Sequence, residues 1–352
     1  MLLENRIDAF SLLGEFLSQF SRENIVRKND IKHNDLFFDA FKLMIKRAKE
    51  SNSWFTDDNV LFALESWSKI LTESNLKRWL STYNLNNQNP KTIAVIMAGN
   101  IPLVGFHDFL TVLISGNDII VKQSSNDNQF LPLIAKYLEY IEPQFKTKIN
   151  FVNGNLENFD AVIATGSDNT ARYFDYYFGK YPHIIRQNRN AVAVITGKES
   201  KDDLENLGED IFRYFGLGCR SVAKIFVPKD YNFDLFFNAV YKYNDIINYP
   251  KYDNNYTYNK AVYLMSLFKL LENGFLMLKE DTSYSSPIAS LFYEFYEDIE
   301  TLKTKLENEN DKIQVVVCNE NIKNSVKFGE TQKPQLSDYA DGVDTMAFLL
   351  KL

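Results

Sequence analysis

The sequence predicts an α/β fold in which a doubly wound parallel sheet follows a helical N-terminal region. Short continuous apolar runs begin at Thr92 and alternate with helical patterns, and most of these runs stop at Gly, Asn or Pro. Residues 1–88 are rich in helical spacing. A chain of 352 residues is also longer than most single domains, which favours two or three domains.

The N-terminal region is expected to be helical up to a linker. Apolar residues recur at helical spacing through residues 7–16, and charged side chains among them exclude the apolar stretch of a signal peptide. Amphipathic stretches follow at residues 36–48 and 59–72. Residues 84–90, which are rich in Asn, are expected to be a linker.

The next part of the chain predicts the doubly wound sheet. Buried strands are expected at residues 92–99, 118–123, 149–154 and 161–166. Helices are expected at 106–115 and 129–140, with a short helix between the last two strands. Such sheets bind ligands just beyond the carboxyl ends of their strands. The candidate contacts there are Gly99, Asn100, Lys122, Ser124, Ser125, Gly166 and Ser167.

A second series of strands and helices begins after Asn190. A strand at 191–196 precedes a helix whose start is marked by Ser200, with Asp203 three residues later. The buried stripe of this helix is expected to be Leu204, Leu207, Ile211, Phe212 and Phe215, and its end is expected at Gly216 and Gly218. Residues up to about 280 are expected to be mostly helical. Further strands are expected at 221–227, 285–295, 312–318 and 342–350.

Composition excludes several classes of protein. The formal net charge of −7 argues against a nucleic-acid surface, which needs clustered Lys and Arg. No run approaches the ~20 apolar residues that a membrane span requires. Two cysteines make no disulfide framework and three histidines supply no metal cluster. The expected setting is the cytoplasm, with both thiols reduced and no metal bound.

Cys219 stands between two glycines and an arginine, at the junction of the predicted 200–216 helix and the 221–227 strand. Glycines let a substrate approach the backbone closely, and Arg220 would favour the thiolate if it points toward the sulfur. The sequence equally allows a small buried residue that fills a turn, because cysteine is often buried. Cys318 ends a strand with no such pattern around it, and a core position is expected.

Several motifs in order resemble the aldehyde dehydrogenase superfamily. They are "VIMAGNIPLVGFHDFLTVLISGNDIIVKQSS" (95–125), "ATGSDNTARYF" (164–174) and "FGLGCRS" (215–221). The last of these falls where the superfamily has its nucleophile loop. Within that superfamily, the 188–228 region and the tail "KFGETQKPQLSDYADGVDTMAFL" (327–349) are most similar to LuxC-type acyl-CoA reductases. The resemblance covers residues 90–350, and it implies a Rossmann-type cofactor domain and an α/β catalytic domain.

The resemblance implies a cysteine acyl-enzyme. The Cys219 thiolate would attack an acyl-CoA and release CoA, and the acyl-enzyme would then be reduced to an aldehyde, with a fatty acyl chain as the expected substrate.

 The superfamily stabilises the tetrahedral oxyanion with an asparagine amide and the nucleophile's own N–H, which here correspond to Asn100 and Cys219. A turn residue before Ile-Pro is the simpler interpretation of Asn100.

The stretch 184–190 lies where aldehyde-oxidising members carry a glutamate that activates water. Here it contains no carboxylate, so the resemblance implies CoA-dependent, reductive chemistry rather than release of a free acid. Arg186 and Arg189 in this stretch are expected to be either surface charges or contacts for the phosphates of CoA.

The resemblance also implies the cofactor contacts. Lys122 matches the lysine that bonds the adenosine ribose, with Ser124 and Ser125 after it. Ser125 stands where NAD-preferring members often have a glutamate; a serine can donate to a 2′-phosphate, which favours NADPH over NADH. Gly166 and Ser167 open a helix whose N-terminal N–H groups would hold a pyrophosphate oxygen, although Ser167 can also be an N-cap.

Two other features receive simpler interpretations. His107 is expected to face solvent or to occupy a satisfied core position rather than to act as a catalytic acid. The acidic tail around Asp338, Asp341 and Asp344 is expected to be a turn with a terminal strand rather than a metal site.

The expected domains are a nucleotide-binding domain with the helical N-terminal part (1–188), a catalytic domain (189–325) and a tail that packs back on the core (326–352). The expected substrate partner is acyl-CoA. The resemblance also allows an enzyme that delivers the acyl group or uses the aldehyde as a partner, and association of the chain with further copies of itself. An acyl-phosphate reductase, another CoA-acylating aldehyde dehydrogenase and a non-catalytic nucleotide-binding protein stay open as alternatives.

Overall fold

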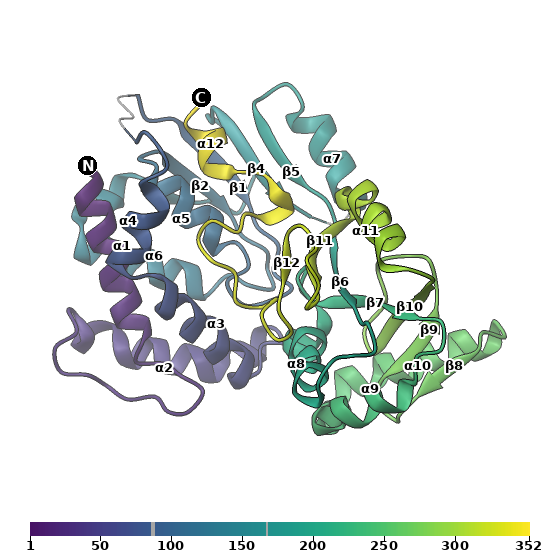
Figure 1. The fold of residues 1–352 in the computed structure, drawn as a ribbon. Coiled ribbons are helices and arrows are strands. Elements are labelled where there is room, and N and C mark those ends of the chain that lie inside the picture. The colour runs from purple at the N-terminus through teal and green to yellow at the C-terminus, as the bar shows by residue number, and fades with distance from the viewer. Residues whose placement is uncertain (86–88, 167) are drawn as a thin grey trace. The chain divides into compact units, whose positions relative to one another are not determined.

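The computed structural model describes residues 1–85, 89–166 and 168–352, and the chain divides into two compact units (Figure 1). Unit 1 comprises residues 1–187 and 335–352, and unit 2 comprises residues 188–334. Unit 2 is thus a continuous stretch of chain inserted into unit 1. The assignment of a nucleotide-binding or a catalytic role to either unit stays a prediction.

Unit 1 begins with four helices, which confirms the predicted helical character of this region: α1 (Leu3–Leu17), α2 (Asn34–Ser51), α3 (Asp57–Ile70) and α4 (Glu73–Leu80). Two of them start at a threonine cap, because the Thr56 and Thr72 side chains accept the N–H of the third helical residue. The apolar face of α1 is fully buried, which explains the helical spacing of its Phe and Leu residues. Residues 86–88 of the expected linker lie outside the described residues.

The sheet of unit 1 is parallel throughout, with the order β3-β2-β1-β4-β5. Its strands are β1 (Thr92–Ile96), β2 (Asp118–Lys122), β3 (Ile149–Phe151), β4 (Ala161–Thr165) and β5 (His183–Arg186). The connecting helices are α5 (Phe106–Ile114), α6 (Phe130–Ile141) and α7 (Asp168–Phe178). The chain runs outward from β1 to β3 and returns to β4 on the other side of β1. The doubly wound prediction is confirmed, and the switch point lies between β1 and β4.

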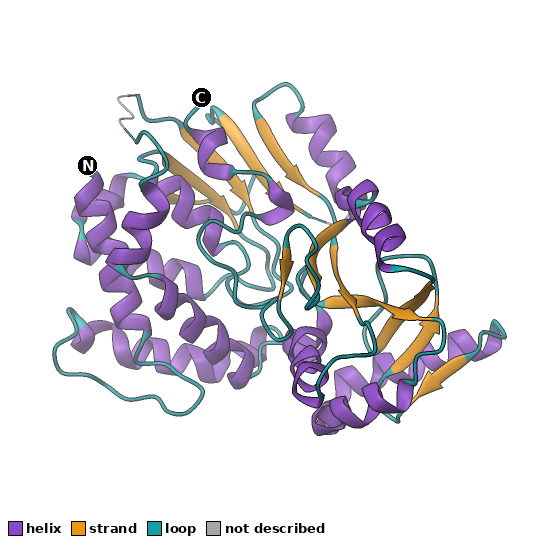
Figure 2. Ribbon diagram, in the orientation of Figure 1, coloured by secondary structure: helices purple, strands orange, loops and turns teal. Residues whose placement is uncertain are grey.

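Unit 2 has a sheet of its own, with the order β12-β11-β6-β7-β10-β9-β8. Its strands are β6 (Asn190–Val194), β7 (Val222–Pro228), β8 (Leu270–Glu272), β9 (Met277–Glu280), β10 (Ser290–Tyr296), β11 (Ile313–Val317) and β12 (Ser325–Val326). Its α-helices are α8 (Lys201–Phe212), α9 (Phe233–Val240), α10 (Pro250–Met265) and α11 (Ile299–Asn308). The β8–β9 pair is antiparallel, and the other pairs are parallel (Figure 2).

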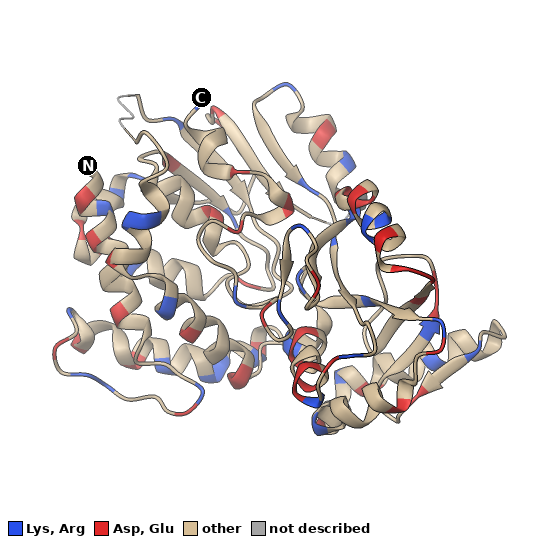
Figure 3. Ribbon diagram, viewed as in Figure 1, with Lys and Arg blue, Asp and Glu red and all other residues tan. Residues whose placement is uncertain are grey.

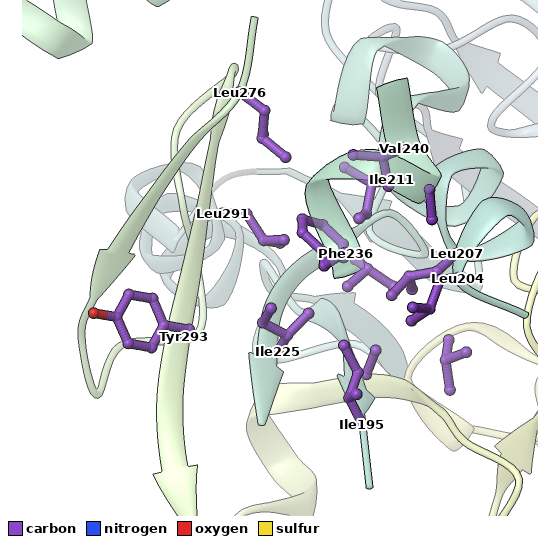
Figure 4. Close-up of a cluster of buried hydrophobic side chains, with 14 of the residues drawn as sticks. Ile195, Leu204, Leu207, Ile211, Ile225, Phe236, Val240, Leu276, Leu291 and Tyr293 are labelled. Atoms are coloured by element: carbon purple, nitrogen blue, oxygen red, sulfur yellow. The ribbon is translucent and has the colours of Figure 1, made fainter. Parts of the chain in front are cut away.

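Both faces of the unit 2 sheet are covered by helices. Side chains of α8 and α9, among them Leu207 and Phe236, pack with Ile225 of β7 on one face (Figure 4). Leu302 and Leu306 of α11 pack with Phe226 on the other face. Each such burial of a large apolar side chain stabilises the fold by about 1.5–3 kcal/mol.

Charged residues of both signs are interspersed on the helices, as α11 illustrates (Figure 3). This distribution differs from the clustered basic surface that nucleic-acid binding requires. Within the described part of the chain, no helix has the length and apolar character needed to cross a bilayer.

Three predictions about elements are wrong, and one, for the stretch before residue 280, is incomplete. Residues 342–350 contain a helix, α12 (Thr345–Leu349), because Asp344 caps it by accepting the Ala347 N–H at 2.8 Å. The predicted short helix after residue 154 is absent from the described residues 155–160. The stretch before 280, expected to be mostly helical, also forms β8 and β9. Finally, α8 ends at Phe212 rather than at Gly216, because Tyr214 and Phe215 adopt left-handed backbone angles.

Candidate functional site

The carboxyl ends of β1 and β2 lie side by side, because Ile96 and Lys122 are aligned in register. Just beyond them, Gly99 touches Ser124: a Cβ on Gly99 would lie 2.7 Å from both Cβ and Oγ of Ser124. Only glycine allows this approach of the two loops. The Ser124 Oγ also accepts the Asn126 N–H at 3.2 Å, which shapes the turn after β2.

Asn100 lies on the loop that follows Gly99, and it is exposed. Two polar side chains hold this loop. Asn52 Nδ2 donates to Gly99 O at 3.3 Å, and Asp127 Oδ2 accepts the Leu103 N–H at 2.8 Å. Leu103 has a left-handed φ of 58°, so its N–H needs a specific partner to stay in this conformation. The loop that carries Asn100 is therefore anchored from α2 and from the turn after β2.

Asp127 was missed by the sequence analysis. Burial raises the pKa of its carboxyl to about 6, although the Leu103 N–H acts in the opposite direction. The only signal in the sequence was its position two residues after Ser125, in a run of turn-forming residues.

The other predicted cofactor contacts lie at the same edge of the unit 1 sheet. Lys122 is the last residue of β2 and is half-buried, and Ser125 is exposed. Gly166 follows β4, where a Cβ would meet Thr170 and Phe174 of α7 at 3.0 Å. Ser167 lies outside the described residues. The edge thus combines one cationic side chain, two hydroxyls and two glycines that permit close approach, next to the switch point of the sheet.

Cys219 belongs to unit 2 and lies on a β-turn before β7. The Ser221 N–H donates to Gly218 O at 2.9 Å, so Cys219 and Arg220 are the two central residues of this turn. Cys219 is half-buried. The approach to the turn is strained, because Tyr214 and Phe215 have φ values of 54° and 57°. Asn100 and Cys219 lie in different units, and their action on one substrate belongs to the proposal below.

The residues that follow Cys219 are held by a distant segment of unit 2, residues 327–333. Arg220 Nε donates to Thr331 O at 2.5 Å. Gln332 Nε2 donates to the Ser221 Oγ at 3.3 Å, and both of these residues are buried. The guanidinium of Arg220 is therefore bound to this segment, whatever it contributes to the thiol.

Asp210, near the end of α8, holds the same segment. Its Oδ2 accepts the Gly329 N–H at 2.7 Å, and its Oδ1 accepts the Thr331 N–H at 3.0 Å and the Thr331 hydroxyl at 2.8 Å. Asp210 and Thr331 are fully buried. Burial raises the pKa of the Asp210 carboxyl to about 6, and the three hydrogen bonds act in the opposite direction.

Cys318 is buried in the apolar cluster beneath α11, so its predicted core position is confirmed. Burial raises the pKa of this thiol, and its Sγ donates to Glu320 O at 3.3 Å. The thiolate of Cys318 is thus disfavoured, and the residue serves as an internal control for the reactivity of Cys219.

The surface interpretation of Arg186 is wrong. Its guanidinium is buried and forms a bidentate ion pair with Asp108 of α5, and it also donates to the Thr345 Oγ at 3.0 Å. A carboxylate already balances its charge, which argues against a contact with CoA phosphates. Arg189 donates to Asn310 O at 3.3 Å in unit 2.

His107 of α5 occupies a satisfied position in unit 1. Its Nε2 lies 2.9 Å from Leu336 O, and its ring packs against Trp79 and Tyr339. Burial lowers the pKa of this imidazole, so the neutral form predominates.

The acidic tail serves local structure. Asp338 Oδ2 accepts the Gln335 N–H at 2.8 Å, and Asp344, besides capping α12, accepts the Tyr83 hydroxyl at 2.8 Å. Over the residues that the structure describes, no group of three His, Cys, Asp or Glu side chains is placed to hold a metal ion.

The profile of the family "Acyl-CoA reductase (LuxC)" matches residues 9–236, which is more than half of the chain. The chain belongs to the LuxC acyl-CoA reductase family. The match includes Asn100, the edge of the unit 1 sheet and Cys219, whereas residues 327–333 lie beyond it. A long-chain acyl-protein thioester reductase of Aliivibrio fischeri is 25% identical over 215 residues. That alignment spans 54% of this chain and 43% of the relative, so this LuxC family member covers less than half of that protein.

Solved aldehyde dehydrogenases share the fold of this LuxC family member. Aldehyde dehydrogenase 21 of Physcomitrella patens, in complex with its product succinate, has a TM-score of 0.68 at 11% identity, covering 100% of this chain and 84% of its own. The indole-3-acetaldehyde dehydrogenase AldA of P. syringae, in complex with NAD+, has a TM-score of 0.60 at 10% identity, covering 90% and 72%. The predicted aldehyde-dehydrogenase-like α/β fold is thereby confirmed.

Proposed function

We propose that this LuxC family member reduces a fatty acyl-CoA to the aldehyde through a thioester on Cys219, with NADPH as the reductant. The observation that carries the proposal is the Cys219 turn. It places a half-buried thiol directly after Gly218 and before Arg220, in the family that is defined by acyl-CoA reduction. The other thiol of the chain, Cys318, is buried and has a raised pKa.

Cys219 acts as the nucleophile. Its thiolate forms a bond to the acyl carbon, and the C–S bond to CoA breaks, so that CoA leaves as a thiolate and takes up a proton from water. NADPH, when bound, supplies the hydride that reduces the acyl carbon. Cys219 then leaves as a thiolate, and an aldehyde is released. The Asn100 amide and the Cys219 N–H donate to the oxyanion in both tetrahedral stages.

The stretch 184–190 supports reduction over hydrolysis. It has no carboxylate to activate water, and Arg186 within it is engaged by Asp108 and Thr345. Water is therefore a poor competitor for the acyl-enzyme, and the thioester persists until the hydride arrives.

The unit 1 edge fits a nicotinamide dinucleotide. The contact of Gly99 with Ser124 brings two loops together at the end of the sheet, as a bound dinucleotide requires. Lys122 would bond the adenosine ribose, and Ser124 and Ser125 would donate to a 2′-phosphate. Gly166 and Ser167 would approach the pyrophosphate. The NAD+ complex of AldA supports this class of cofactor.

Acylation tests the proposal. Wild-type protein and the Cys219→Ala and Cys318→Ala variants are incubated with radiolabelled long-chain acyl-CoA. Hydroxylamine-sensitive label is expected on wild type and on Cys318→Ala but not on Cys219→Ala. Label on the Cys219→Ala variant would refute the proposed nucleophile.

The acyl donor is a separate choice. The name of the A. fischeri relative favours a protein thioester as an alternative donor, and an acyl phosphate is a further alternative within the same chemistry. Aldehyde formation is measured from acyl-CoA, an acyl-protein thioester and an acyl phosphate. We expect acyl-CoA to be used best. If none of the three gives aldehyde, the non-catalytic alternative stands.

The setting of the enzyme also belongs to the proposal. We place it in the cytoplasm, with an acyl-delivering or aldehyde-using enzyme as a partner and self-association as a further expectation. Size-exclusion chromatography with light scattering tests the last of these.

A further inference from the structure

We infer that Asp210 is a positioning residue for the Cys219 turn, and that it acts through residues 329–332 of the 327–333 segment. This inference rests on the proposed role of Cys219 as the nucleophile. Asp210 itself contacts neither Cys219 nor any reacting atom in the set of hydrogen bonds described above. It fixes the segment that in turn fixes the two residues after the cysteine.

The first link is the three-fold anchoring of the segment. Asp210 accepts the N–H groups of Gly329 and Thr331 and the Thr331 hydroxyl, across sequence separations of 119 and 121 residues. Gly329 has a φ of 84°, and a Cβ there would lie 3.1 Å from Asn206 of α8. The segment is thus an irregular backbone pressed against α8, and it depends on a side chain for its hydrogen bonds.

The second link connects the anchored segment to the turn. Thr331, which Asp210 holds through two of its atoms, uses its carbonyl to accept from Arg220 Nε at 2.5 Å. The next residue, Gln332, donates to the Ser221 Oγ. Arg220 and Ser221 are the third and fourth residues of the β-turn in which Cys219 is second. Movement of residues 329–332 would therefore be transmitted to the thiol over one or two peptide units.

The third link is the position of Asp210 on α8. The helix ends at Phe212, and the strained residues Tyr214 and Phe215 lead from it directly to the turn. Asp210 therefore connects both supports of Cys219: the helix end that precedes the turn and the segment that holds the residues after it. Burying a carboxylate is costly, and three donors on one group offset that cost.

A purely structural role is the alternative, and substitutions distinguish the two. Asp210→Asn keeps the size of the side chain but sets an NH2 group against backbone N–H donors. Thr331→Val removes only the hydroxyl bond, and Thr331→Ser restores it. Ser200→Ala is the matched control on the same helix: it removes the N-cap bond to Asp203 and typically lowers stability by about 1 kcal/mol, far from the turn.

The test measures chemistry on folded protein in a Cys318→Ala background. Rates of acylation by long-chain acyl-CoA, of alkylation by iodoacetamide, and kcat and KM for reduction are determined after thermal melts confirm folding. Asp210→Asn is expected to slow acylation and lower kcat about tenfold or more, with KM changed less than about twofold, because the nucleophile is misplaced. Thr331→Val is expected to slow acylation and to lower kcat about threefold. Thr331→Ser and Ser200→Ala are expected to match wild type in both quantities.

Each outcome decides the matter. Wild-type acylation by folded Asp210→Asn overturns the inference, as does an equal loss in Ser200→Ala. If Asp210→Asn does not fold, Thr331→Val decides, since it keeps both backbone bonds to Asp210: a wild-type rate overturns the inference, and a loss rescued by Thr331→Ser supports it. Label on Cys219→Ala instead refutes the proposed function, whatever the Asp210 and Thr331 variants show.

Discussion

The Asn100 loop of unit 1 and the Cys219 turn of unit 2 are both held by an aspartate side chain, but the two aspartates differ in how far along the chain their partners lie. Each is an irregular segment containing left-handed residues, and each depends on a buried or partly buried aspartate whose pKa is raised to about 6. Asp127 makes one backbone bond, to a residue 24 positions away. Asp210 makes three bonds, to residues about 120 positions away. The side chains that hold the loop lie 24 and 47 positions away along the chain, whereas the turn depends on a segment about 120 positions from Asp210.

The largest expected effect separates the two regions chemically. Asn100→Ala should slow acylation of Cys219 by about 10²- to 10³-fold, because one oxyanion donor is lost. Alkylation of Cys219 by iodoacetamide should stay at the wild-type rate, since that reaction forms no oxyanion. Both rates are measured by mass spectrometry, with exposed Asn128→Ala as the control. Unchanged acylation in Asn100→Ala would remove this residue from the mechanism.

The next effect concerns backbone approach. Gly99→Ala should destabilise unit 1 by about 1–3 kcal/mol, because the new methyl group overlaps Ser124. It should also weaken NADPH binding, since the loops at the sheet edge must separate. The control is Gly154→Ala, where a Cβ meets nothing within 4 Å. Thermal melts and cofactor titrations give the two values, and equal melts for both variants would contradict the close contact.

A pH titration compares the two aspartates directly. Their folded pKa of about 6 lies above the unfolded value of 3.8, so the folded state binds the proton more tightly. Their contribution to stability is complete below about pH 4 and is lost as the pH rises through 6. Between pH 5 and pH 7, ionisation of each aspartate should lower the free energy of unfolding of the wild type by about 1 kcal/mol relative to that of the corresponding Asp→Asn variant. Urea unfolding at both pH values measures this difference, and a gap independent of pH would exclude the raised pKa.

The smallest effect tests the cofactor edge. Ser125→Glu should shift the preference from NADPH toward NADH by about three- to tenfold in kcat/KM, because a carboxylate repels a 2′-phosphate and bonds ribose hydroxyls. Ser125→Ala controls for loss of the hydroxyl alone. An unchanged ratio in Ser125→Glu would place the ribose elsewhere.

What the sequence could predict depends on how far apart the interacting residues are. Most of the parallel strands, α8 with its Ser200–Asp203 capping box, and the connection that carries Cys219 were predicted because their signals lie within a few residues, whereas the short strands β5, β8, β9 and β12 were not. Asp210 was not predicted as an anchor, because its partners Gly329 and Thr331 are joined to it only by the tertiary fold. Arg186 shows the same limit: nothing near it in the sequence indicates Asp108 or Thr345.

Near the C-terminus, a short apolar run predicted a strand where a polar N-cap instead begins a helix. Residues 342–350 have the composition of a buried strand, yet the Asp344 cap begins a helix there. The 200–216 helix was extended too far because Phe215 continues the apolar spacing, although its backbone is left-handed.

The insertion of unit 2 into unit 1 has a consequence for biosynthesis. The Arg186–Asp108 pair is completed by Thr345, which lies in the last piece of unit 1 to be made. At about 5–20 residues per second, synthesis of unit 2 separates the two pieces of unit 1 by roughly 7–30 seconds. Residues 335–352 follow unit 2 in the chain, so the hydrogen bond from Arg186 to Thr345 and the packing of α12 on α5 can form only after unit 2 has been synthesised.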